Sequence, residues 1–152
     1  MSEPQWDLYE EPTGSLRTIL ANVMIHDVAL ALAIETPGDD VWLIEQCAGT
    51  RWHYRVGHSS IRVRRIKGIW VLTGSSAKWP RNVRCVRIEL VVPLSAFHEA
   101  ESGWLALAPA NAGDSPGTLS WIDQQGNVNQ TLALPPLEEM LDSGPTWYAP
   151  TD

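Results

Sequence analysis

Residues 51–73 read RWHYRVGHSSIRVRRIKGIWVLT, and this stretch decides the fold. Two runs in which polar and apolar residues mostly alternate, 51–56 and 61–66, and a mainly apolar run at 69–73 are separated by turn residues at 57–60 and 67–68. Strict alternation is typical of half-buried strands, because successive side chains of a strand point to opposite faces. The stretch therefore predicts antiparallel strands and not helices.

The same pattern continues on both sides of this stretch. Residues 16–25 fit a helix face behind Ser15 and a strand equally well. Strands that recur every roughly 8–12 residues favour a sandwich or a barrel. The chain is therefore predicted to be all-β and mainly antiparallel, a single-domain β-sandwich of immunoglobulin-like, jelly-roll or barrel type with one or two short helices. The further strands are expected at 28–34, 41–47, 83–92, 103–108, 117–123 and 127–134, and a brief helix at 136–141.

Three segments are expected along the chain: an acidic N-terminal arm at 1–14, a sandwich domain at 15–145 and a tail at 146–152. The arm has little periodicity, so we expect docking of Trp6, Leu8 or Tyr9 to order it. The strand number and the Gly/Pro turns resemble those of immunoglobulin-like sandwiches, in architecture alone. Trp52 follows Cys47 too closely for the cysteine–tryptophan–cysteine pattern of that family.

The amino-acid composition is that of an ordinary globular protein. The 152 residues are 44% apolar and 19% charged, with a net charge of −7, which excludes a collagenous, coiled-coil or disulfide-dense protein. No apolar run reaches the roughly 18 residues that a membrane span needs, and the first residues lack the pattern of a signal peptide. We therefore expect a cytoplasmic protein without membrane contact. In that compartment Cys47 and Cys85 are expected to be thiols, whereas an exported chain would allow a bridge between them.

Charge is segregated along the sequence. Residues 51–87 hold ten basic and no acidic side chains, and all other segments together carry a charge of −17. Arginine outnumbers lysine eight to two in this basic segment. The planar guanidinium suits bidentate contacts with carboxylates or phosphates and stacking on aromatic rings. This bias indicates defined anion contacts more than diffuse attraction.

If the basic strands pair as a hairpin, their charged side chains lie together on one face of a sheet. If 51–56 pairs with 61–66, Arg55 lies opposite Arg62 and His53 opposite Arg64. Like charges that face each other destabilise a sheet, so an anion is expected there. It is either an acidic segment of the same chain or a foreign partner. The opposite face would be core, and alternation places these residues on it: Trp52, Tyr54, Val56, Ile61, Val63, Trp70 and Leu72.

Two residues of the basic segment stand apart from this surface. Alternation puts Arg65 on the core side, either stacked between Trp52 and Trp70 or turned outward by a bulge. Trp79 lies between cations in a loop, where it is either a contact residue or a lid on the end of the sandwich.

The leading hypothesis is a noncatalytic binding or regulatory module for an acidic protein partner. One alternative is a small enzyme that holds an anionic small molecule with arginines and uses His53 or His58 as acid or base. A second alternative is single-stranded nucleic-acid binding, which the charge outside the basic segment disfavours. Common catalytic motifs and metal-ligand spacings are missing, so no metal and no cofactor are expected, and the oligomeric state is left open. The expected contact residues are Arg51, Arg55, Arg62, Arg64, Lys78, Trp79 and Arg81.

Overall fold

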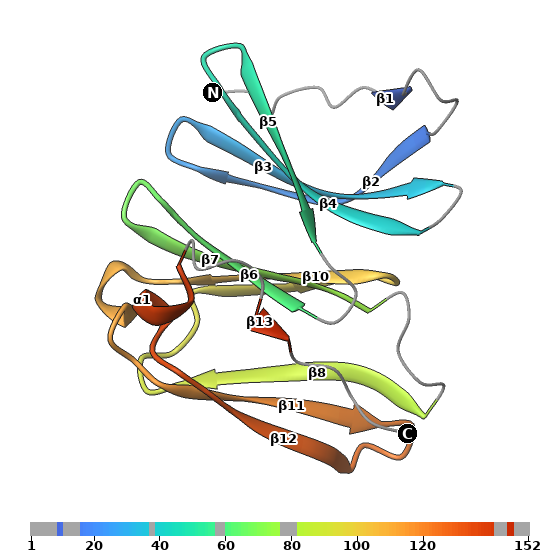
Figure 1. The fold of residues 1–152 in the computed structure, drawn as a ribbon, viewed down its shortest axis with the longest axis vertical. Coiled ribbons are helices and arrows are strands. Elements are labelled where there is room, and N and C mark those ends of the chain that lie inside the picture. Colours follow the sequence, from blue (N-terminus) through green and yellow to red (C-terminus); the bar gives the residue numbers. More distant parts are fainter. Residues whose placement is uncertain are drawn as a thin grey trace.

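The structure, a computed structural model, describes residues 9–10, 16–36, 39–56, 60–76, 82–141 and 146–147. These residues form three antiparallel sheets, which Figure 1 shows stacked as an upper, a middle and a lower sheet. The predicted all-β, mainly antiparallel fold is confirmed, and its described strands form three sheets. Residues 16–25, which the sequence left open, form a strand.

The upper sheet is a meander whose strands follow one another in the order of the sequence. Its strands are β1 (Tyr9–Glu10), β2 (Leu16–Ile25), β3 (Val28–Thr36), β4 (Asp40–Cys47) and β5 (Thr50–Val56). Ala48 and Gly49 join β4 to β5, and both have positive φ angles of 51° and 82°. Two such residues in a two-residue loop match the twist of the strands that they connect.

The two central strands of the middle sheet, β7 (Ile69–Ser75) and β10 (Gly103–Ala108), are buried on both faces. The order of this sheet is β13 (Thr146–Trp147), β6 (Ser60–Ile66), β7, β10 and β9 (Ala96–Glu99). Trp70 and Leu72 of β7 pack toward the lower sheet, whereas Val71 between them packs toward the upper sheet. Burial on both faces explains the unbroken apolar runs of β7 and β10.

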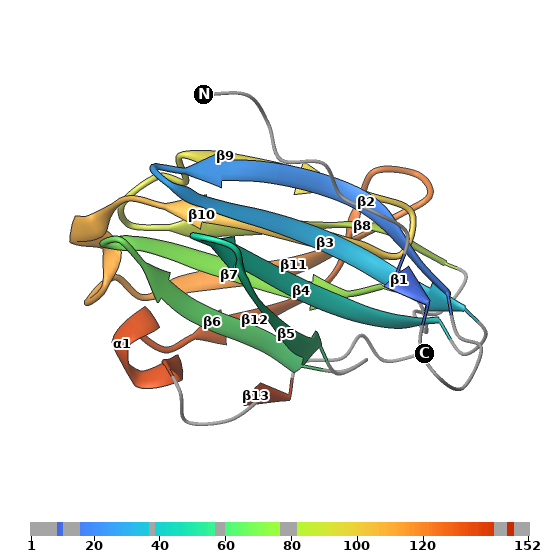
Figure 2. The same cartoon turned by 90° about the horizontal axis from the view of Figure 1, so that it is seen from above.

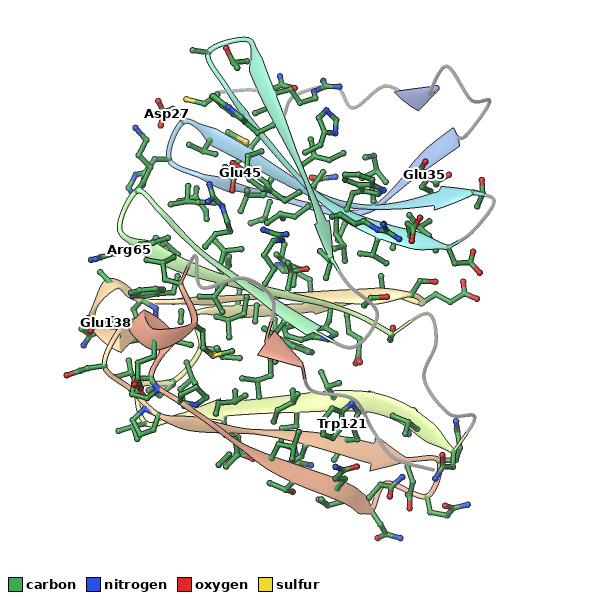
Figure 3. The ribbon with its side chains drawn as sticks, in the orientation of Figure 1. Asp27, Glu35, Glu45, Arg65, Trp121 and Glu138 are labelled. Atoms are coloured by element: carbon green, nitrogen blue, oxygen red, sulfur yellow. The ribbon has the colours of Figure 1, made fainter. Side chains whose placement is uncertain are left out.

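The lower sheet packs against the middle sheet, and a second hydrophobic core lies between them. The lower sheet contains β12 (Val128–Leu134), β11 (Gly117–Asp123) and β8 (Val83–Leu90) in that order. A 3₁₀ turn (Ala110–Ala112) and the helix α1 (Leu137–Met140), within the range predicted for a helix, complete the described elements. Trp121 of β11 lies between the middle and lower sheets (Figure 3) and is only 1% exposed.

The expected hairpin between 51–56 and 61–66 does not form. β5 pairs with β4 and β6 pairs with β7, so the chain leaves the upper sheet after Val56 and enters the middle sheet at Ser60. The predicted register of β6 against β7 is confirmed, with Val63 opposite Leu72 and Arg65 opposite Trp70. The prediction failed at the sheet crossing, because a four-residue loop suits both a hairpin and a crossing.

A close contact between a glycine and an indole fixes the pairing of β7 with β10. Gly74 lies opposite Trp104, and a Cβ atom added at Gly74 would lie 2.5 Å from two carbons of the Trp104 ring. Only glycine therefore fits beneath this ring. The Trp104 indole also stacks on Phe97 of β9, with 6.2 Å between the ring centroids.

Candidate functional site

The predicted arginine face is divided between two sheets. Alternation along β5 places Arg51, His53 and Arg55 on the side of the upper sheet that faces away from the middle sheet, level with Ile44 of β4. Arg64 lies on β6 opposite Val71, whose side chain packs into the core between the upper and middle sheets. The outward face of β5 therefore lies outside the upper sheet, whereas this face of β6 lies between the upper and middle sheets. The expectation of one continuous arginine surface was wrong.

Arg64 forms an ion pair that joins the two sheets. Its Nε lies 2.8 Å from Glu45 Oε1 and its Nη2 lies 3.2 Å from Glu45 Oε2. Glu45 is 7% exposed, and Figure 3 shows it between the upper and middle sheets. A carboxylate at this depth needs a partner, because an unpaired buried charge is costly. The Arg64 charge is thus neutralised inside the molecule.

Two guanidinium groups lie over the ring of Tyr54 on β5. The Cζ atom of Arg64 lies 4.3 Å from the centroid of the Tyr54 ring, and that of Arg62 lies 5.6 Å from it. Arg64 Nη2 also donates to the Tyr54 hydroxyl oxygen at 3.1 Å. Cations over an aromatic face are attracted by the ring quadrupole, which orients both guanidinium groups.

Arg62 differs from Arg64 in having no carboxylate partner among the described residues. Its Nε donates to the backbone oxygen of Arg55 at 3.0 Å, and its other contact is the Tyr54 ring. A guanidinium has four further N–H groups on Nη1 and Nη2, and its planar fork suits a carboxylate. Arg62 is therefore the cation of this region best suited to a foreign anion.

Trp52 adds an exposed apolar surface next to these cations. It lies directly opposite Glu45 in the β4–β5 register and is 46% exposed. The prediction that Trp52 belongs to the core was therefore wrong, because β5 is the last strand of its sheet. We name this group the Tyr54 cluster, and its members are Glu45, Trp52, Tyr54, Arg62 and Arg64.

The outward cations of β5 have partners within their own sheet. Arg51 donates to Gln46 Oε1 from Nε at 2.9 Å and from Nη2 at 2.6 Å. Arg55 Nη2 lies 2.8 Å from Asp40 Oδ1 in an exposed pair. Such surface pairs contribute roughly 0–1 kcal/mol, so they orient these arginines more than they stabilise the fold.

Some predicted residues lie elsewhere. Lys78, Trp79 and Arg81, together with His58, lie outside the described residues. Arg65 stacks on Trp70 as one of the two expectations had it, with its Cζ 5.2 Å from the ring centroid, although it is exposed. The second indole expected there, Trp52, belongs to the upper sheet.

A second polar group connects the middle and lower sheets at β9 and β8. Glu99 Oε2 accepts a hydrogen bond from the Val86 N–H at 3.2 Å. Burial raises the pKa of the Glu99 carboxyl, while that hydrogen bond and Arg84 act in the opposite direction. Burial also raises the pKa of the Cys85 thiol, and Glu99 adds to the effect. No pattern in the sequence indicated this contact, because β9 was not predicted.

Groups that could support chemistry are sparse among the described residues. No set of three His, Cys, Asp or Glu side chains there is arranged to hold a metal ion. Cys47 and Cys85 are free thiols on the upper and lower sheets. The middle sheet separates the two strands that a disulfide bridge would have to join.

An open depression of about 360 Å³ lies between Glu89–Val91 and Pro116–Thr118, on elements other than those of the Tyr54 cluster. No described helix is long and apolar enough to cross a membrane.

Comparison with known proteins gives no relative from which a role could be transferred. No protein-family model, curated protein or solved structure matches this chain. The function has to be argued from the residues themselves.

Proposed function

We propose that this protein is a noncatalytic binding module that holds an acidic segment of a partner protein at the Tyr54 cluster. One observation carries the proposal. Two arginines lie over the Tyr54 ring, but only one of them has a carboxylate partner among the described residues. Glu45 neutralises Arg64, while Arg62 lies over the ring of Tyr54, two residues along β5 from the exposed Trp52, and has no carboxylate partner among the described residues. A carboxylate on the partner would complete this arrangement.

The chemistry of the cluster specifies the partner. A guanidinium fork binds a carboxylate through two parallel hydrogen bonds, which are stronger than bonds between neutral groups. An apolar side chain next to that carboxylate would cover Trp52, and buried aromatic and arginine residues are the usual centres of binding energy in protein interfaces. The partner segment is therefore acidic with an adjoining apolar residue.

Two features favour binding over catalysis. His53, the histidine proposed as acid or base, lies on the outward side of β5, whereas Arg62 belongs to the Tyr54 cluster on β5 and β6. The cluster itself contains no histidine and no cysteine. We further propose that the protein acts in the cytoplasm, where the free thiols of Cys47 and Cys85 persist.

The test uses a fluorescein-labelled peptide of eight glutamates and fluorescence anisotropy at low salt. The protein carries a net charge of −7, so nonspecific attraction works against this probe and saturable binding reports a local site. Arg62→Gln should weaken binding about tenfold, the loss expected for one charge-assisted contact. The matched control is Arg87→Gln, which removes an equally charged side chain from the lower sheet.

The expected result is weaker binding by Arg62→Gln and unchanged binding by Arg87→Gln. Equal losses in the two variants, or no saturable binding by the unmodified protein, would overturn the proposal. A peptide of eight lysines should not bind to the cluster. If it bound as tightly as the acidic peptide, the proposed charge recognition would also be refuted.

A further inference from the structure

The outer strand β12 carries no charged side chain. Among the described elements, the outer strands longer than two residues are β5, β8, β9 and β12. β5 and β8 each contain two arginines, and β9 contains Glu99. β12 has the sequence VNQTLAL and forms the edge of the lower sheet on the side of α1 (Figures 1 and 2). Charged side chains and prolines normally keep an outer strand from pairing with another chain, so β12 lacks this protection.

The direction of the backbone groups of β12 follows from its neighbours in the sheet. In an antiparallel ladder, the N–H and C=O groups of one residue point to the same side, and successive residues alternate. The Val86 N–H of β8 donates to the Glu99 carboxylate of the middle sheet, so it points away from β11. Trp121 lies opposite Val86, and its backbone groups therefore point to β12. The bond from the Val91 N–H to the Pro116 oxygen agrees with this alternation, since Pro116 lies an odd number of positions before Trp121 and points to β8.

This alternation leaves two residues of β12 with outward backbone groups. Gln130 lies opposite Trp121, so its backbone groups point to β11. The next residue, Thr131, therefore directs its N–H and C=O away from β11, and so does Ala133. Both residues are exposed, and no described strand pairs with this edge. Leu132 between them bonds to β11, and its side chain packs against the core.

We propose that β12 pairs antiparallel with β12 of a second copy of this chain, around a twofold axis at Leu132. Thr131 of each copy then faces Ala133 of the other, and each such pair forms two backbone hydrogen bonds. The register is limited at both ends, because the ladder is irregular before Gln130 and Pro135 has no N–H group. The two Leu132 side chains face each other across the axis, so each covers the exposed part of the other.

Charge favours β12 over the other outer strands for a contact between two copies. Each copy carries a net charge of −7, so two copies repel each other and a contact that adds further repulsion is disfavoured. Self-pairing of β5 or β8 would bring arginines toward arginines, which destabilises a sheet. Self-pairing of β12 brings no charged side chains together. The inference does not depend on the proposed function, because β12 belongs to the lower sheet and the Tyr54 cluster belongs to the other two.

The first experiment measures amide hydrogen exchange by NMR in the unmodified full chain. The Thr131 and Ala133 amides should exchange at least tenfold more slowly at millimolar than at low micromolar concentration, because pairing places them in a ladder. The Leu132 amide, which bonds to β11 in either state, is the internal reference. If the exchange of Thr131 and Ala133 did not change with concentration, the proposal would be overturned, including the case in which this edge pairs only with a foreign strand.

Two charge variants, compared by sedimentation equilibrium, test the edge itself. Ala133→Lys should weaken association about tenfold, because the two introduced ammonium groups lie diagonally across the axis on one face of the sheet. The side chain at this position is exposed, so the single copy should stay folded. Gln125→Lys makes the same change of charge in the exposed turn before β12 and should associate like the unmodified chain. Association of Ala133→Lys that equals that of the unmodified chain, or an equal loss in both variants, would overturn the proposal.

Discussion

Removal of Arg64 is the substitution with the largest expected effect on stability, because Glu45 would be left buried without its cation. Arg64 and Glu45 form two hydrogen bonds of 2.8 and 3.2 Å between the upper and middle sheets, and their side chains are 22% and 9% exposed. Breaking a buried pair by removing one partner costs about 3–5 kcal/mol. Water reaches the Arg64 side more easily, so we expect Arg64→Met to cost about 3 kcal/mol of unfolding free energy, at the lower end of that range.

The assay is a double-mutant cycle measured by urea denaturation. Replacing both partners, as in Glu45→Leu with Arg64→Met, removes the buried charge together with its cation, and exchange of buried pairs for apolar residues is often neutral or stabilising. The double variant should therefore be more stable than Arg64→Met alone. If Arg64→Met cost less than about 1 kcal/mol, or if the double variant lost as much as both single variants together, the reasoning about this pair would be refuted.

Three further predictions follow from other contacts. Gly74→Ala should lower stability by about 1–3 kcal/mol in thermal denaturation, because the new methyl group collides with the Trp104 ring, and Trp104→Phe in the same chain should restore part of the loss. Burial raises the pKa of Glu99, so its contribution to stability is full below its ordinary pKa of about 4.5 and is lost as pH rises through the higher folded value. Glu99→Gln should therefore be more stable than the unmodified protein at neutral pH and show a flatter pH profile, with Glu101→Gln as the control for charge. Trp52→Ser should weaken binding of the acidic peptide with little effect on stability, because the indole is 46% exposed.

The contradicting outcomes are distinct for each of these predictions. A Gly74→Ala variant as stable as the parent would mean that β7 and β10 separate easily at this point. A Glu99→Gln variant with the same pH profile as the parent would assign the pH dependence to other groups. A Trp52→Ser variant that binds the acidic peptide as tightly as the parent would remove this indole from the proposed interface.

Alternation along single strands was predictable from the sequence, whereas the assignment of strands to sheets was not. The register of β6 against β7 follows from the two-residue turn at Lys67 and Gly68, both of which have positive φ angles. The loop at 57–60 carries no comparable constraint, so the hairpin and the crossing to another sheet were equally compatible with it.

A signal for the third sheet was nevertheless present in the sequence. The runs IWVLT at 69–73 and GWLALA at 103–108 are apolar at successive positions, which is typical of strands that are buried on both faces. Given that reading, the arginines of β6 would face a second sheet and would need a buried carboxylate. Glu45, which directly follows the apolar run at 41–44 of β4, was the matching residue.

How well the candidate site could be predicted also depended on the assignment of strands to sheets. Clustering of arginines in sequence drew attention to Arg62 and Arg64, whose guanidinium groups lie over one aromatic ring. It could not indicate that Arg51 and Arg55 point away from that ring, because their direction depends on which side of β5 meets the middle sheet. Trp52 was assigned to the core for the same reason.

The most direct test of the account is an NMR titration of the full chain with the peptide of eight glutamates. It follows the indole N–H of Trp52 and the Nε–H groups of the arginine side chains. We expect saturable shifts at Trp52 and at Arg62, with the Arg87 signal unchanged. Shifts confined to Arg87 or Arg84, with Trp52 and Arg62 unmoved, would contradict the claim that the Tyr54 cluster is where this protein binds an acidic partner.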